Sequence, residues 1–173
     1  MMYDPDPAGV VRHVQVSNAP LQDFAVSGPI LWVASYQGQS IYRLETHTGH
    51  IGGRVTWTLD LPARPIAIAL EGDRVWASLD DGTIAVVDKE QERIVDIVDV
   101  TERVSRMVAG GGLLWALQPS KRALVAIDIA SLRIVDVIGV GRHPAEIEWV
   151  GDHVWVTNTR DGTVTRISPA AVR

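Results

Sequence analysis

The segment Val75-Trp76-Ala77-Ser78 identifies the fold class, because nearly the same sequence recurs along the chain. The other copies are Leu31-Trp32-Val33-Ala34, Leu114-Trp115-Ala116-Leu117 and Val154-Trp155-Val156-Thr157. Successive tryptophans are spaced by about 44, 39 and 40 residues, each after a glycine-containing turn. A fixed period of this length indicates a repeat protein in which each copy forms one small antiparallel sheet.

The second copy shows how one repeat divides into strands. Short runs rich in Val, Ile and Trp suit a half-buried pleated surface, and they alternate with turn signals such as Asp80-Asp81-Gly82. We expect strands at 66–70, 74–78, 83–88 and 93–100. No segment has a sustained helical period, so the sequence predicts essentially no helix.

Four such copies predict an all-β fold, a β-propeller of four four-stranded antiparallel blades. Residues 1–9 are expected to form an N-terminal tail and residues 10–173 the propeller domain. The predicted blades span about 17–61, 62–100, 101–140 and 141–173, and residues 10–16 add the last strand of the fourth.

The two ends of the sequence suggest how the propeller closes. Residues 4–20 align without gaps on 128–144, so 10–16 matches the last strand of the third copy, whereas the fourth copy lacks that strand. An N-terminal strand in this place covers an otherwise open sheet edge. It belongs either to the same chain, giving a four-bladed ring, or to a partner chain, giving an eight-bladed homodimer by strand exchange. A piece of a longer propeller is a third interpretation.

The repeated tryptophans are expected to be core residues wedged between blades, because each indole buries a large apolar area. Trp57 and Trp149 fall outside the repeat register. They are the better candidates for exposed rings, although packing is the favoured interpretation for them as well.

Two segments carry a resemblance to a known family. Val154–Asn158 with the following Gly162-Thr163-Val164, and Ile134–Gly141 followed by Pro144, resemble the YVTN-type repeat. This is the repeat of surface-layer and quinoprotein-dehydrogenase-like propellers, distantly similar to the virginiamycin B lyase group. The resemblance covers nearly the whole chain and implies the propeller fold. It implies no single function, and the lyase group's histidine and glutamate set has no counterpart at the required spacing.

Composition excludes several function classes. The chain has 173 residues, of which 46% are hydrophobic and 21% charged, as in ordinary globular proteins. Its net charge of -5 argues against binding duplex nucleic acid or an anionic membrane. Residues 1–7 lack signal-peptide character and no apolar run is long enough to span a membrane, so we expect a cytoplasmic location if the chain is complete.

Loops at one end of the propeller carry basic residues. In the loops that join one blade to the next, the third position reads Ala19, Arg64, Arg103 and His143. Such loops converge on the propeller axis and are held by rigid strands. The sequence therefore predicts a site for a small anionic ligand or a peptide, with Arg64, Arg103, Arg142, His143 and Arg160 as ligand-binding residues. Lys121 and Arg122 extend this set.

Catalytic and metal chemistry find little support. His143 with Glu146 is the one pair suited to acid–base catalysis, yet a loop histidine beside a solvated glutamate is the commoner arrangement. His47 and His50 lack a third ligand, and there is no cysteine, so we expect neither a metal nor another cofactor.

The sequence favours a non-catalytic ligand-binding or peptide-binding module. A lyase or hydrolase resembling the virginiamycin B lyase group, with His143 and Glu146, is one alternative. A structural or oligomerisation propeller is the other.

Overall fold

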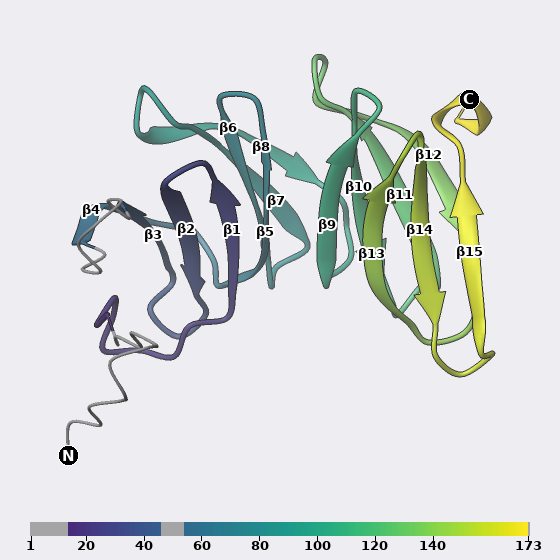
Figure 1. Cartoon of the computed structure of the whole chain (residues 1–173), viewed down its shortest axis with the longest axis horizontal. Coiled ribbons are helices and arrows are strands. Elements are labelled where there is room, and N and C mark those ends of the chain that lie inside the picture. The colour runs from purple at the N-terminus through teal and green to yellow at the C-terminus, as the bar shows by residue number, and fades with distance from the viewer. Residues whose placement is uncertain (1–13, 46–53, 173) are drawn as a thin grey trace, which may run out of the picture.

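A computed structural model shows a β-propeller of four antiparallel blades, and it describes residues 14–45 and 54–172 (Figure 1). Blade 1 contains β1 (Asp23–Ser27), β2 (Ile30–Ser35), β3 (Ser40–Glu45) and β4 (Arg54–Asp60). Blade 2 contains β5 (Pro65–Glu71), β6 (Arg74–Leu79), β7 (Thr83–Asp88) and β8 (Arg93–Asp99). Blade 3 contains β9 (Arg106–Gly110), β10 (Leu113–Gln118), β11 (Ala123–Asp128) and β12 (Arg133–Gly139). Blade 4 contains β13 (Pro144–Val150), β14 (His153–Asn158) and β15 (Thr163–Ile167).

The all-β prediction is confirmed. The blade 2 strands begin and end within one residue of the expected positions. Among the described residues, helix is limited to the short 3-10 turn η1 (Pro169–Ala171), for which Ser168 supplies the N-cap. Each blade is a simple meander in which consecutive strands pair.

The fourth blade has three strands within the described residues. Of the segment 10–16 expected to complete it, residues 10–13 lie outside the described residues. Residues 14–16 are described, and they are not part of a strand.

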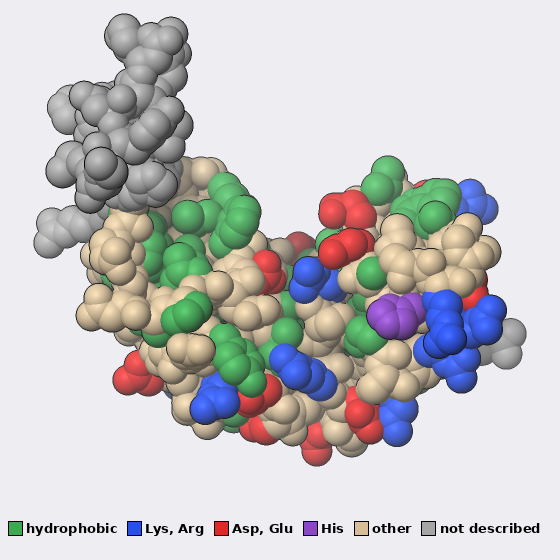
Figure 2. All heavy atoms as spheres, turned by 90° about the horizontal axis from the view of Figure 1, so that it is seen from below, with side chains coloured by type: hydrophobic (Ala, Val, Ile, Leu, Met, Phe, Trp, Pro, Cys, Tyr) green, Lys and Arg blue, Asp and Glu red, His purple; other side chains and the backbone are tan. Residues whose placement is uncertain are grey.

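The blades follow one another along an open arc. Their innermost strands contact in the order β1, β5, β9 and β13, whereas blades 1 and 4 lie at opposite ends of the molecule (Figure 1). Seen from the end where the blade-to-blade loops lie, the molecule is hollowed between two arms (Figure 2). Each blade thus has a leading face, toward the next blade, and a trailing face, toward the preceding one.

The core lies between blades rather than within one. In the first inter-blade layer, Trp32 and Ile41 of the leading face of blade 1 pack in one cluster with Ile68 and Val75 of the trailing face of blade 2. The layers between blades 2 and 3 and between blades 3 and 4 are built in the same way around Trp76 and Trp115. These three tryptophans are buried, as the repeat predicts, whereas the fourth, Trp155, is only partly buried, because blade 4 has no following blade among the described residues.

The two tryptophans outside the register also pack. Trp57 meets Trp32 edge to face, with ring centroids 5.7 Å apart. Trp149 packs on Gly110, where an added Cβ would overlap the indole ring.

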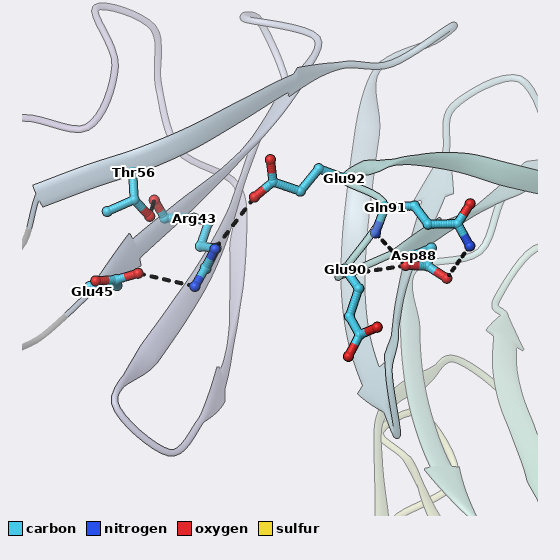
Figure 3. Close-up of polar contacts among 7 residues, drawn as sticks. All are labelled: Arg43, Glu45, Thr56, Asp88, Glu90, Gln91 and Glu92. Carbon is cyan, nitrogen blue, oxygen red and sulfur yellow. Dashed lines mark hydrogen bonds and ion pairs between the residues drawn. The ribbon is translucent and has the colours of Figure 1, made fainter.

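Polar contacts tie the blades together at the rim. Arg43 of β3 reaches across to Glu92 of blade 2, with Nη1 and Oε1 3.5 Å apart (Figure 3). Arg74 of blade 2 donates to the carbonyl of Ile129 in blade 3 at 2.8 Å. The turn that carries Glu92 is fixed by Asp88, whose carboxylate accepts from the amides of Glu90 and Gln91 (Figure 3).

Candidate anion-binding site

An open pocket of about 400 Å³ lies where loops of blades 3 and 4 meet, and we call it the loop pocket. Its lining residues are Pro119, Ser120, Arg122, Arg142, His143 and Arg160. Figure 2 views this end of the molecule and shows Lys and Arg side chains gathered beside a histidine on the blade 4 arm. The lining is therefore rich in cationic side chains.

Backbone hydrogen bonds hold the three contributing loops side by side. On one side, the amide of Val140 donates to the carbonyl of Arg122 at 2.9 Å. On the other, the amides of Thr159 and Arg160 donate to the carbonyls of His143 and Arg142 at 3.0 and 3.3 Å. The loop that carries Arg142 and His143 is thus fixed between the two flanking loops.

A close approach of Gly141 to Asn158 supports the same loop. An added Cβ on Gly141 would lie 2.5 Å from the side-chain Cγ of Asn158, so a larger residue would push the loop away. Asn158 is buried at the end of β14 and donates to the hydroxyls of Thr163 and Thr165. The glycine thus lets the loop rest on a fixed buried amide.

Two of the lining residues have an unusual backbone. Arg122 and His143 have φ values of 52° and 58°, in the left-handed region that non-glycine residues seldom adopt. The conformation of Arg122 recurs at Gln39, Gly82 and Gly162, which also directly precede the third strand of their blades, so it belongs to the turn of the repeat. His143 directly precedes β13, and both residues line the loop pocket.

The charge balance of the loop pocket is positive. Arg142 binds Asp161 through its amide and through Nε, with N–O distances of 2.5 and 2.6 Å. The amide and then the guanidinium of Arg142, with a smaller effect of Arg122, hold the pKa of Asp161 below its ordinary value. Within the part of the chain that the structure describes, Arg122 and Arg160 make no ion pair, so two guanidinium groups are available to an incoming anion.

The predicted ligand-binding residues divide into two groups. Arg142, His143 and Arg160 line the loop pocket together, and Arg122 joins them. Arg64 and Arg103 lie in the equivalent loops of earlier blades and are not part of this lining. The guanidinium of Arg64 lies over the ring of Tyr36, 5.4 Å from its centroid. Lys121 is paired with Glu102 at 2.9 Å, so its charge is already balanced.

The structure places His143 and Glu146 in different surroundings. Glu146 lies on β13, where its carboxylate binds Arg106 of blade 3 at 3.1 and 3.3 Å. His143 lines the loop pocket, and Glu146 does not. Over residues 14–45 and 54–172, no hydrogen bond joins the two side chains, and their catalytic pairing stays a prediction.

Metal-ligating groups do not assemble in the described residues: no group of three or more His, Asp or Glu side chains there could hold an ion. His47 and His50 lie outside the described residues. None of the helices in the described part of the chain is long and apolar enough to cross a membrane.

Comparison with known proteins shows the fold and nothing finer. No protein-family model matches the chain, and no curated protein matches it. Among solved structures, it is similar to hydrazine synthase of Kuenenia stuttgartiensis, with a TM-score of 0.71, 17% identity and coverage of 92% of this chain and 53% of that one. It is also similar to the WD40 domain of Toxoplasma gondii coronin, with a TM-score of 0.69, 16% identity and coverage of 87% and 48%.

A third similar structure is the computationally designed Ika4 protein, with a TM-score of 0.75, 13% identity and coverage of 90% of this chain and 95% of that one. The chain therefore spans about half the length of the hydrazine synthase and coronin chains, and nearly all of Ika4. These neighbours support the assignment of the chain to the β-propeller proteins.

Proposed function

We propose that this protein is a non-catalytic ligand-binding propeller module, and that the loop pocket takes an oxyanion group of a small ligand. The observation that carries the proposal is the convergence of Arg122, Arg142, Arg160 and His143 on one open pocket, with two of the guanidinium groups free of ion pairs in the described structure. Guanidinium groups bind carboxylate and phosphate by paired, charge-assisted hydrogen bonds. The repeat phrases agree with a YVTN-type propeller, in which the ring is a scaffold for loops.

The overall charge of the protein strengthens the argument. A net charge of -5 repels anions on average, so anion binding requires a local cationic concentration of this kind. Asp161 limits the site, because its carboxylate occupies the Nε side of Arg142 and competes with a ligand.

Calorimetric titration with inorganic pyrophosphate and with citrate tests the proposal. Arg160→Ala should weaken binding of the better probe by about tenfold or more, since a hydrogen bond to a charged group is worth roughly 1.5–3 kcal/mol. Arg133→Ala is the matched control, because Arg133 is also exposed but begins β12 at the opposite end of the propeller. Asp161→Asn should tighten binding by removing the competing carboxylate.

Binding that is the same in Arg160→Ala and Arg133→Ala would contradict the loop pocket as the site. If neither probe binds at millimolar concentration while a short oligoglutamate peptide does, the occupant is an acidic peptide rather than a small anion.

A further inference from the structure

The leading face of blade 4 exposes positions that the other blades bury. Val164 occupies the strand position of Ile41, Ile84 and Leu124 in blades 1 to 3. Those three side chains are 0% exposed, whereas Val164 is 57% exposed. Trp155 is likewise only partly buried, and in place of a following blade the guanidinium of Arg166 lies over its ring at 5.7 Å.

The trailing face of blade 1 likewise exposes positions that the other blades bury. Phe24 occupies the position of Ile68, Met107 and Ile147 in blades 2 to 4. Those residues are 5%, 8% and 8% exposed because the preceding blade covers them, whereas Phe24 is 63% exposed. Val26, two residues along β1 on the same face, is exposed as well.

These two faces resemble the two halves of an internal inter-blade layer. In each internal layer, a tryptophan and an aliphatic residue of a leading face meet aliphatic residues of the next trailing face. Blade 4 offers Trp155 and Val164, and blade 1 offers Phe24 and Val26. Burial of such apolar side chains in an interface favours association, because it removes their surface from water.

The outer edge of β15 lies at the same end of the molecule. Blade 4 ends at β15 among the described residues, whereas in blade 3 the strand β12 covers the equivalent β11. The uncovered edge and the exposed face of blade 4 therefore lie together at one end of the described arc (Figure 1).

We infer that two copies of this chain associate head to tail into an eight-bladed ring. The trailing face of blade 1 of each copy covers the leading face of blade 4 of the other. The contact forms twice about a two-fold axis. A second copy is the fitting occupant because each face repeats an internal layer and because the two faces of one chain lie at opposite ends of the arc (Figure 1).

Light scattering coupled to size exclusion tests this inference on the full chain. At micromolar concentration the wild-type mass should be about twice the 18.9 kDa of one chain. Phe24→Asp should halve it, because the carboxylate would be buried against Trp155 and Val164 of the other copy. Val137→Asp is the matched control: Val137 is similarly exposed, but it lies on the outer strand of blade 3, away from both free faces. It should leave the doubled mass unchanged.

Hydrogen exchange supplies the second measurement. The amides of β1 and β15 should exchange more slowly in the wild type than in Phe24→Asp, because the other copy covers the faces that carry Phe24 and Val164. Circular dichroism should show that the variant keeps its sheet content. A wild-type mass of one chain would overturn the inference, and so would a doubled mass with equal exchange of these amides in the two proteins.

Discussion

Blades 2 and 4 are built on nearly the same phrase, yet their tryptophans have different surroundings. Trp76 is completely buried between blades 2 and 3, whereas Trp155 is partly exposed at the end of the arc. The strand and its register are equivalent in the two cases, although Trp76 lies opposite Val86 and Trp155 opposite Arg166. A repeat position thus becomes core only when the next blade is present, because each layer of the core is shared by two blades.

The largest expected effect is the difference in unfolding free energy lost when each of these two tryptophans is replaced by alanine. Trp76→Ala should lower the free energy of unfolding by about 3–5 kcal/mol, since it leaves a cavity in a fully buried layer. Trp155→Ala should cost less than half as much when measured by urea denaturation at a concentration where single chains prevail. Equal losses would mean that the outer face of blade 4 is as well packed as an internal layer.

The layer between blades 3 and 4 can be disturbed by overpacking rather than by a cavity. Gly110→Ala places a methyl group against the ring of Trp149, and overpacking of this kind costs about 1–3 kcal/mol of stability. The control is Gly139→Ala, because a Cβ there meets no atom within 4 Å. The midpoint of thermal unfolding should fall for the first variant and stay within error for the second.

Acid should destabilise blades 2 and 3, because carboxylates in their turns lose their charge. The hydroxyl and amide of Ser131 lower the pKa of Asp128 below its ordinary value, and the amide of Gln91 does the same for Asp88. A lowered pKa in the folded protein means that the carboxylate stabilises the fold above the unfolded-state pKa, and that this contribution is lost as the pH falls below about 4. Asp128→Asn should therefore reduce the difference in urea midpoint between neutral pH and about pH 3.

Blade 4 offers the control for the acid effect. Ser168 follows Trp155 at the corresponding distance and caps η1 with an uncharged hydroxyl. Ser168→Ala should lower stability by the same amount at both pH values. A larger loss of stability at about pH 3 than at neutral pH in this variant would show that the acid sensitivity does not come from the turn carboxylates.

The smallest expected effect concerns the rim. Arg43 and Arg166 occupy the same strand position, but Arg43 reaches Glu92 of the next blade, whereas Arg166 covers a ring of its own blade. A double-mutant cycle of Arg43→Ala with Glu92→Ala should give a coupling below about 1 kcal/mol that decreases with salt. A coupling that salt leaves unchanged would show that the pair is not a solvated rim contact.

Much of the fold was predictable from the sequence, because its signals are local. The alternation of β-branched residues and turns predicts the strands of blade 2, and the tryptophan period predicts the buried layers. Loop position alone places Arg142, His143 and Arg160 at one end of the propeller.

The rest depends on which blade faces which, and that has no local signal. The pairing of Glu146 with Arg106 joins blade 4 to blade 3. The contact of Arg64 with Tyr36 joins two loops that are far apart in sequence. The sequence names Arg122 as an extension of the basic set, but its place beside Arg142 and Arg160 depends on how blades 3 and 4 meet.

The unlike ends of the arc have a consequence for assembly. A contact that joins a front to a back can in principle be repeated without limit, and only the angle turned per copy decides whether it returns to its origin. Two copies close into a ring if each turns through half a circle, whereas copies with a slightly straighter arc would continue into a helical filament. Substitutions that alter the bend between blades, such as one at Gly110, therefore threaten solubility as well as stability.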